Sequence, residues 1–114
     1  MHDQADIDML CVWMQWRLLV ENETTGNKVW ETPRHGIVLS TGFDPFMRAE
    51  DCAVVIAEAE RKHVKWSLGH DGPGGNGPLY RCTIGGRAPV VSEHSWTAAF
   101  CVAIVAGLED GHLE

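Results

Sequence analysis

Residues 98–108 read Ala-Ala-Phe-Cys-Val-Ala-Ile-Val-Ala-Gly-Leu, eleven consecutive positions without a polar side chain. A helix formed by this stretch is apolar all round, so none of its sides is suited to contact with water. At about 1.5 Å of rise per residue it is only ~17 Å long, well short of the roughly 30 Å core of a bilayer. The stretch therefore predicts a buried helix with protein on both flanks, its own sheet on one side and a second helix or another subunit on the other.

The length and composition of the chain fit one globular domain. Its 114 residues suffice for a single core, and 45% of them are hydrophobic, which is ordinary for a globular protein. We therefore expect a single domain over residues 1–114, with loose ends at 1–4 and 110–114. A formal net charge of −7 argues against a non-specific nucleic-acid binder, which normally carries a basic stripe.

The four cysteines stand singly along the chain, without the Cys-x-x-Cys spacing of redox or metal motifs. Single thiols in apolar surroundings usually act as small core side chains. No segment combines a charged start with an apolar middle, as an export leader does. These features predict a cytoplasmic protein with four free cysteines and no membrane partner. The cysteines are Cys11, Cys52, Cys82 and Cys101.

Two helices with short strands between them are expected in the first part of the chain. Apolar spacing places the first helix at about 5–17, and residues 18–20 and 36–39 are candidate strands. Asp44-Pro45, an N-cap acid followed by proline, predicts a second helix at about 45–62. The buried stripe expected on this helix consists of Ala49, Cys52, Ala53, Ile56 and Ala57. The charged residues expected mostly on its other side are Glu50, Asp51, Glu58, Arg61 and Lys62.

A hairpin and a last helix are expected in the remainder. Residues 64–68 and 79–84 alternate between apolar and polar side chains, which predicts an antiparallel hairpin with one covered face. Residues 88–91 are a candidate third edge segment, and Ser92 or Ser95 can cap a final helix at about 95–109. The expected fold class is α+β, a small and mainly antiparallel sheet packed between or against helices, in the order α-β-β-α-β-β-α.

No catalytic, cofactor or metal site is predicted. The glycines Gly72, Gly74 and Gly77 match Gly-x-Gly-x-x-Gly, but a strand follows them where a nucleotide-binding motif opens a helix. A hairpin connection is the better interpretation. No serine or cysteine stands in a Gly-x-Ser-x-Gly turn, so the patterns favour a non-enzymatic protein. The candidate zinc ligands, which lack the short spacing of structural sites, are His63, His70, Cys82 and His94.

Five tryptophans are a high number for this length, and tryptophan is favoured at interface anchors. Core packing accounts well for Trp66. Three others lie near the ends of expected elements, where partial exposure is plausible. We expect them to form a contact patch for a partner protein or a second subunit. They are Trp16, Trp30 and Trp96.

The outer face of the predicted hairpin is the alternative functional surface. It would carry Lys65 and Arg81, with Arg61 and Lys62 nearby, and such a basic patch can contact phosphates. The aromatic side chains that would stack on single-stranded bases point inward in this register. A solvated sheet face is the simpler interpretation, and nucleic-acid binding is the second hypothesis.

The order of these pieces resembles the phage ABA-sandwich domain family of small phage and prophage proteins. Trp13-Met14-Gln15-Trp16 is similar to the family's Val-Met-Gly-Trp signature, with Gln15 in place of the glycine. The other similar stretches are the helix from Asp44-Pro45, the tryptophan-containing strand 64–68, the tyrosine-containing strand 79–82 and the Ala-rich helix through 99–103 and Leu108.

The resemblance implies a helix–sheet–helix arrangement, a phage or prophage origin, and the cytoplasm of a bacterial host cell. It implies no catalytic residues and no cofactor. The function expected from the chain as a whole is that of a non-enzymatic phage accessory protein, a protein-interaction module. Its partner would be an unknown protein or a second copy of the chain.

Overall fold

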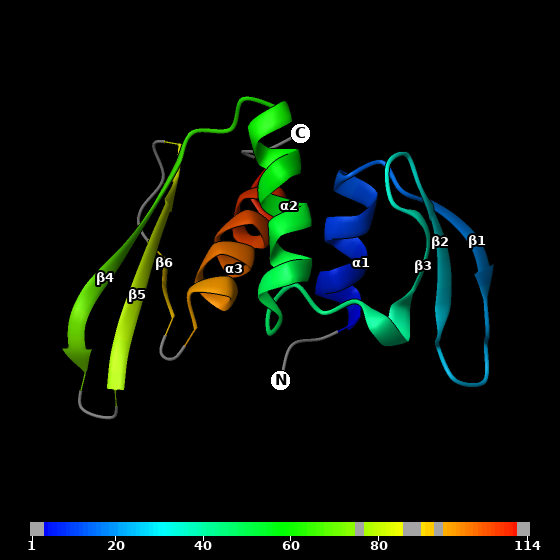
Figure 1. Ribbon diagram of the computed structural model, residues 1–114, viewed down its shortest axis with the longest axis horizontal. Coiled ribbons are helices and arrows are strands. Elements are labelled where there is room, and N and C mark those ends of the chain that lie inside the picture. Colours follow the sequence, from blue (N-terminus) through cyan, green and yellow to red (C-terminus); the bar gives the residue numbers. More distant parts are fainter. Residues whose placement is uncertain (1–3, 75–76, 86–89, 93–94, 112–114) are drawn as a thin grey trace. The chain divides into compact units, whose positions relative to one another are not determined.

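The computed structural model describes residues 4–74, 77–85, 90–92 and 95–111 (Figure 1). Three helices and two antiparallel three-stranded sheets are formed in this part, which confirms the α+β class. The chain divides into two compact units, residues 1–44 and residues 45–114. Unit 1 consists of α1 (Gln4–Trp13), β1 (Arg17–Glu21), β2 (Lys28–Thr32), β3 (Gly36–Leu39) and the short 3-10 helix η1 (Ser40–Gly42). Unit 2 consists of α2 (Ala49–Arg61), β4 (Trp66–Gly74), β5 (Gly77–Ile84), β6 (Val90–Ser92) and α3 (Trp96–Glu109).

The sheet of unit 1 is a meander in the order β1-β2-β3. Trp30 at its centre pairs with Leu18 of β1 and with Val38 of β3. The register shifts between Leu18 and Val20, so Leu19 forms a bulge in the edge strand. The candidate strands 18–20 and 36–39 are confirmed as β1 and β3, whereas β2 between them was not predicted.

A part-buried ion pair ties α1 to this sheet. The ammonium of Lys28 in β2 donates a hydrogen bond to Asp8 Oδ2 at 2.7 Å and lies 3.2 Å from Glu21 Oε2. Beyond α1, the Trp16 ring packs on the Phe43 ring with centroids 4.9 Å apart. The expected loose ends, 1–4 and 110–114, fall partly outside the described residues, and Gln4 already belongs to α1.

Two positions after the last residue of each of the described helices α1, α2 and α3 stands a residue with left-handed backbone. These residues are Gln15 (φ 63°), His63 (φ 57°) and Gly111 (φ 72°). After α1, Gln15 N–H donates to the Val12 carbonyl and Trp16 N–H to the Cys11 carbonyl, which is the Schellman arrangement. The first helix therefore ends earlier than expected. Gln15 stands where the resembled signature has a glycine, the residue that adopts this conformation without a steric cost.

The second helix begins at Ala49 and not at Pro45. The prediction from Asp44-Pro45 was wrong because the carbonyls that follow are used for tertiary contacts. Pro45 O accepts from the Cys101 thiol, and Phe46 O accepts from the Thr97 hydroxyl at 2.6 Å. Both donors belong to α3, so this segment forms a turn, in which the Phe46 side chain is fully buried.

The buried stripe predicted for α2 was also wrong except at Cys52. Ala49, Ala53 and Ala57 are exposed and Ile56 is half-buried. The buried residues of the helix are Cys52, Val55, Glu58 and Ala59. Glu58 lies inside this stripe because Arg61 and Lys62 both form ion pairs with its carboxylate, which offsets the cost of burying a charge.

The hairpin of unit 2 has the predicted face. Val64, Trp66 and Leu68 are half-buried, whereas Lys65 and Ser67 between them are exposed. The strands β4 and β5 are longer than expected, and β6 pairs with β5 as the third strand, so the sheet order is β4-β5-β6.

The last helix has the position and burial that its sequence predicts. α3 contacts β4, β5 and β6 as well as α2, and no residue from Thr97 to Leu108 is exposed. Its N-cap is Ser95, whose side chain accepts a hydrogen bond from Ala98 N–H. Trp66 of β4 meets Phe100 edge-on with ring centroids 5.1 Å apart. The eleven apolar positions are thus covered by helix and sheet of the same unit.

Candidate interaction surface

Unit 1 exposes large apolar side chains on its two edge strands. They are Leu18, Leu19 and Val20 of β1 and Ile37 and Leu39 of β3, here called the apolar strip. The exposed fractions of Val20, Ile37 and Leu39 are 59%, 57% and 54%, values typical of side chains that nothing in the unit covers. Among the described residues only Val12 and Met47 add to the exposed large hydrophobic side chains, so five of the seven belong to this one sheet.

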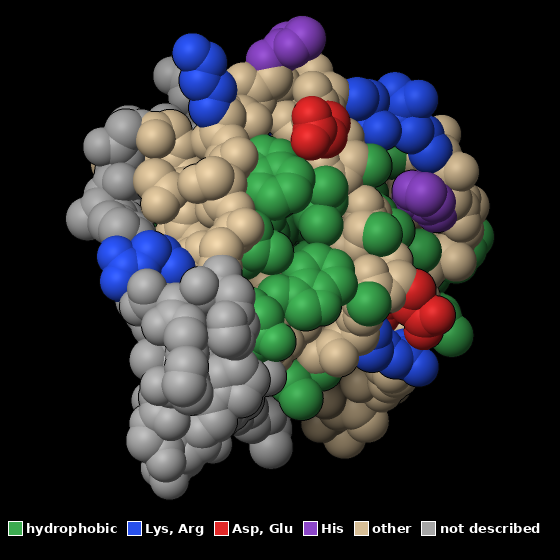
Figure 2. Space-filling model, turned by 60° about the vertical axis from the view of Figure 1, so that its left-hand side comes forward, with side chains coloured by type: hydrophobic (Ala, Val, Ile, Leu, Met, Phe, Trp, Pro, Cys, Tyr) green, Lys and Arg blue, Asp and Glu red, His purple; other side chains and the backbone are tan. Residues whose placement is uncertain are grey.

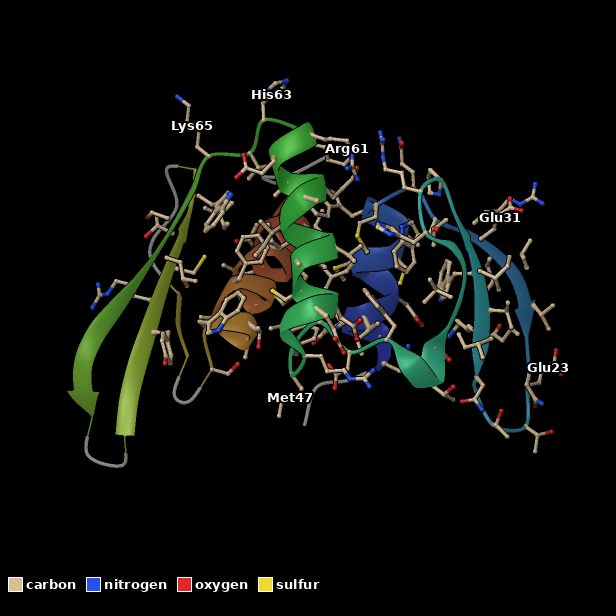
Figure 3. All side chains as sticks on the ribbon, in the orientation of Figure 1. Glu23, Glu31, Met47, Arg61, His63 and Lys65 are labelled. Carbon is tan, nitrogen blue, oxygen red and sulfur yellow. The ribbon has the colours of Figure 1, made fainter. Side chains whose placement is uncertain are left out.

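The register shows that part of the strip is continuous across the sheet. Val20 lies opposite Val29 of β2, and Val29 lies opposite Leu39 of β3. Directly opposite residues point to the same face, with Cβ atoms about 5 Å apart. These side chains point away from the face that holds the buried Trp30, and their face is here called the outer face of the sheet. The next row of the outer face holds Arg17, Glu31 and Ile37. Figure 3 shows Glu31 pointing outward from the sheet.

Opposite charges bracket the apolar residues of β1. Arg17 precedes them and Glu21 follows them, and all five side chains of this strand are exposed. Arg17 Nε lies 3.6 Å from Glu31 Oε1, and Glu21 pairs with Lys28. The side chains of Arg17 and Glu21 are 73% and 46% exposed, so both charged ends of the strand stay open to a further partner.

The tryptophans expected to be exposed are in large part buried. The exposed fractions of Trp16 and Trp30 are 7% and 4%, so the expected partial exposure was wrong for both. Trp30 lies on the inner face of β2, beside the buried Thr32 two residues on, and Trp16 packs on Phe43. Trp96 is half-buried at the start of α3.

Sequence reasoning missed the apolar strip, although one signal pointed to it. Leu18-Leu19-Val20 are consecutive apolar residues in a strand, so they cannot all point to one covered face. If the chain is expected to form a single small sheet, such a run predicts a buried strand. Its exposure follows from its place at the edge of a separate three-stranded sheet.

The predicted basic face is smaller than expected. Lys65 and Arg81 are both exposed, and Figure 3 shows Lys65 pointing away from the chain ahead of β4. Lys65 O accepts from Gly85 N–H, and Arg81 pairs with Gly69, so the two cations are four positions apart, about 13 Å along the hairpin. Arg61 and Lys62 are engaged with Glu58. Among the residues that the structure describes, the face therefore offers two basic side chains, in place of a four-charge patch.

Hydrophobic side chains also gather on the face that is turned forward in Figure 2, which brings the β4–β5 side into view. Lys, Arg, Asp, Glu and His side chains surround them. In unit 2, Trp66 and Trp96 are both half-buried, and Trp66 Nε1 donates to Glu60 Oε1 at 3.2 Å. Both rings are thus more covered than the side chains of the apolar strip.

The four cysteines are free and buried, as the sequence predicts. In unit 2 the sulfurs of Cys52 and Cys101 lie 3.9 Å apart. Burial, with the Asp8 carboxylate beside it, raises the pKa of the Cys11 thiol to about 12. Burial raises the pKa of Cys82 to about 11. At neutral pH these two groups are thiols and not thiolates, the form that attacks substrates or binds metals.

The remaining motifs form no site in the described residues. Gly72 and Gly74 belong to β4 and Gly77 to β5, so the Gly-x-Gly-x-x-Gly match lies at the end of the hairpin, as interpreted. In the part of the chain that the structure describes, no three His, Cys, Asp or Glu side chains are grouped as metal ligands would be. Of the four candidate zinc ligands, His94 and the side chain of His70 lie outside the described residues. None of the described helices is long and apolar enough to cross a membrane.

Comparison with protein-family models, with curated proteins and with solved structures finds no match to this chain.

Proposed function

We propose that this protein is a non-enzymatic protein-interaction module that contacts its partner through the apolar strip of unit 1. The observation that carries the proposal is the exposure of five large apolar side chains on β1 and β3. Val20 and Leu39 lie on the outer face of the sheet on either side of Val29, and Ile37 lies in the next row of that face, whereas Leu18 lies opposite Trp30. An apolar patch of this kind on a folded surface marks a contact site, because leaving it in water costs free energy that binding recovers.

The composition of the strip fits a protein contact better than a nucleic-acid contact. An interface typically combines an apolar centre with a polar rim, and here Arg17, Glu21 and Glu31 border the apolar residues. Nucleic-acid binding at Lys65 and Arg81 would rest on two cations in a chain of net charge −7. Salt-dependent retention on DNA or RNA, lost on charge reversal at these two residues, would favour that alternative.

The phage or prophage origin and a bacterial cytoplasmic location belong to the same proposal. They are supported by the motif resemblance of Trp13–Trp16 and of the hairpin strands. An accessory protein of this kind would act by binding and not by turnover.

Site-specific photocrosslinking tests the contact surface. The photoreactive residue p-benzoylphenylalanine is placed at Leu39 in the strip and, as a control, at the exposed Lys65 of unit 2, in cells of the source organism. We expect irradiation to join a polypeptide to the Leu39 position and not to the Lys65 position, because Leu39 belongs to the exposed apolar strip and Lys65 is an exposed charged residue of the other unit. Equal labelling at both positions, or none at Leu39, would contradict the proposal.

A further inference from the structure

We propose that Cys52 and Cys101 form a reversible disulfide that links α2 to α3 inside unit 2 when the protein meets a peroxide. The two sulfurs lie 3.9 Å apart, close to van der Waals contact, although the residues are 49 positions apart in the chain. Cys52 stands in the first half of α2 and Cys101 in the first half of α3. This inference concerns the core of unit 2 and is independent of the apolar strip.

The distance between the two sulfurs suits the formation of a bond. A disulfide has an S–S length of about 2.05 Å, so each sulfur has to move by about 1 Å toward the other. A small rotation about each Cα–Cβ bond moves a sulfur by this amount. Burial raises the pKa of Cys82 in β5 to about 11, and the nearby Cys52 adds to the shift. Cys82 is therefore the alternative partner for Cys52, and the test has to distinguish the two pairings.

Hydrogen bonds hold the two thiols in this position. The Cys101 thiol donates to the carbonyl of Pro45 at 3.3 Å, and the Cys52 thiol donates to that of Thr97 at 3.9 Å. A thiol is a weak donor, so little is lost when oxidation removes both protons. The Phe46 carbonyl keeps the Thr97 hydroxyl as its donor at 2.6 Å, so the turn before α2 remains attached to α3.

Burial restricts the oxidant to a small molecule. Both cysteines are 0% exposed, so a bulky disulfide such as oxidised glutathione reaches them only if unit 2 unfolds. Hydrogen peroxide is close to water in size and enters through local opening of the fold. The reaction is therefore slow, and the bond, once formed, is protected from bulky reductants in the same way.

The oxidation balances as a two-electron step. One thiol loses its proton, and its sulfur attacks an oxygen of hydrogen peroxide, which breaks the O–O bond and gives a sulfenic acid and water. The second thiol loses its proton and attacks the sulfenic sulfur, so that the S–S bond forms and the hydroxyl leaves as a second molecule of water. The two sulfurs together lose two electrons, and the peroxide gains them. A dithiol reductant restores both thiols by exchange.

Peptide mapping of the oxidised wild-type chain tests the pairing. The reduced protein is treated with hydrogen peroxide, its remaining thiols are blocked in denaturant, and the digested peptides are identified by mass spectrometry. We expect one disulfide, between Cys52 and Cys101, with Cys11 and Cys82 blocked as free thiols. The same treatment of the urea-unfolded chain should give a mixture of pairings, because the fold is what brings this pair together. The oxidised chain should melt about 5 °C or more above the reduced one, since the bond closes a long loop of the unfolded chain.

The matched control is Cys82→Ala, which removes another buried thiol of unit 2 and should leave the linked peptides and the melting shift unchanged. Cys101→Ala should abolish both, and circular dichroism shows whether each variant folds. Linkage of Cys52 to Cys82 in the folded wild type would overturn the proposal. So would retention of all four thiols at a peroxide concentration that oxidises the unfolded chain, or an oxidised chain that melts no higher than the reduced one. The wild-type mapping needs no variant, so it decides the pairing even where a variant fails to fold.

Discussion

The last helix and the first strand both contain apolar runs, yet the helix is buried and the strand is exposed. In α3 no residue from Thr97 to Leu108 is exposed, whereas in β1 all five residues are exposed. The difference lies in the neighbours, because α3 has a sheet and α2 beside it in unit 2, and β1 is the edge of a small sheet in unit 1. An apolar sequence thus predicts that a segment needs a neighbour. It does not say whether that neighbour belongs to the same chain.

The largest expected effect compares two isoleucines. Ile104 in α3 is fully buried and Ile37 in β3 is 57% exposed. Ile104→Ala should lower the free energy of unfolding by about 3 kcal/mol, because it removes buried methyl groups and leaves a cavity. Ile37→Ala should change it by less than about 0.5 kcal/mol. Urea unfolding measures both, and equal losses would mean that the two regions do not differ in packing.

A smaller effect is expected where unit 1 does bury a charge. Lys28→Met should cost about 2 kcal/mol, because it leaves the part-buried Asp8 without its ammonium partner. Lys65→Met, at an exposed lysine, should cost less than about 0.5 kcal/mol. The hydrogen bond that its ammonium donates to Asp8 raises the pKa of Lys28. This stabilisation is therefore complete below about pH 10.4 and is lost as the pH rises further, which urea unfolding of wild type and variant can follow.

The loss of folding stability at alkaline pH compares the buried thiols of the two units. The pKa values of Cys11 and Cys82 are raised to about 12 and about 11, whereas a thiol in the unfolded chain ionises near pH 8.5. The unfolded state therefore gains as the pH rises, and by about pH 9.5 each thiol should lower stability by about 1 kcal/mol. Unfolding under reducing conditions at about pH 7.5 and 9.5 measures the loss. Cys82→Ala should show a smaller loss than wild type, and an identical loss would contradict the assignment.

The smallest effect compares the ends of α1 and α2. Gln15 and His63 both hold left-handed backbone that favours glycine. Gln15→Gly and His63→Gly should each raise stability by about 1 kcal/mol, one in each unit. Gly111→Ala, at the matching position after α3, should lower it. A drop in the melting temperature of Gln15→Gly would show that its side chain contributes more than its backbone costs.

The candidate surface could be predicted from the sequence only in part. The run Leu18-Leu19-Val20 was visible, but its exposure depends on β2, whose mixed residues Lys28 and Glu31 gave no strand pattern. For the tryptophans the error was the opposite one, because residues expected to be partly exposed are buried. Trp30 alternates onto the inner face of β2, which only the strand register reveals.

The sequence by itself determined α3 and the hairpin of β4 and β5, because an unbroken apolar run and two-residue alternation are local properties of the chain, whereas the structure decided that Ser95 and not Ser92 is the cap. The free and buried cysteines followed from their apolar neighbours. Only the tertiary structure decided where α2 begins, since the carbonyls of Pro45 and Phe46 bond to α3 side chains far along the chain. It also decided that Glu58 is buried and β1 is not, because burial depends on which distant segments pack together.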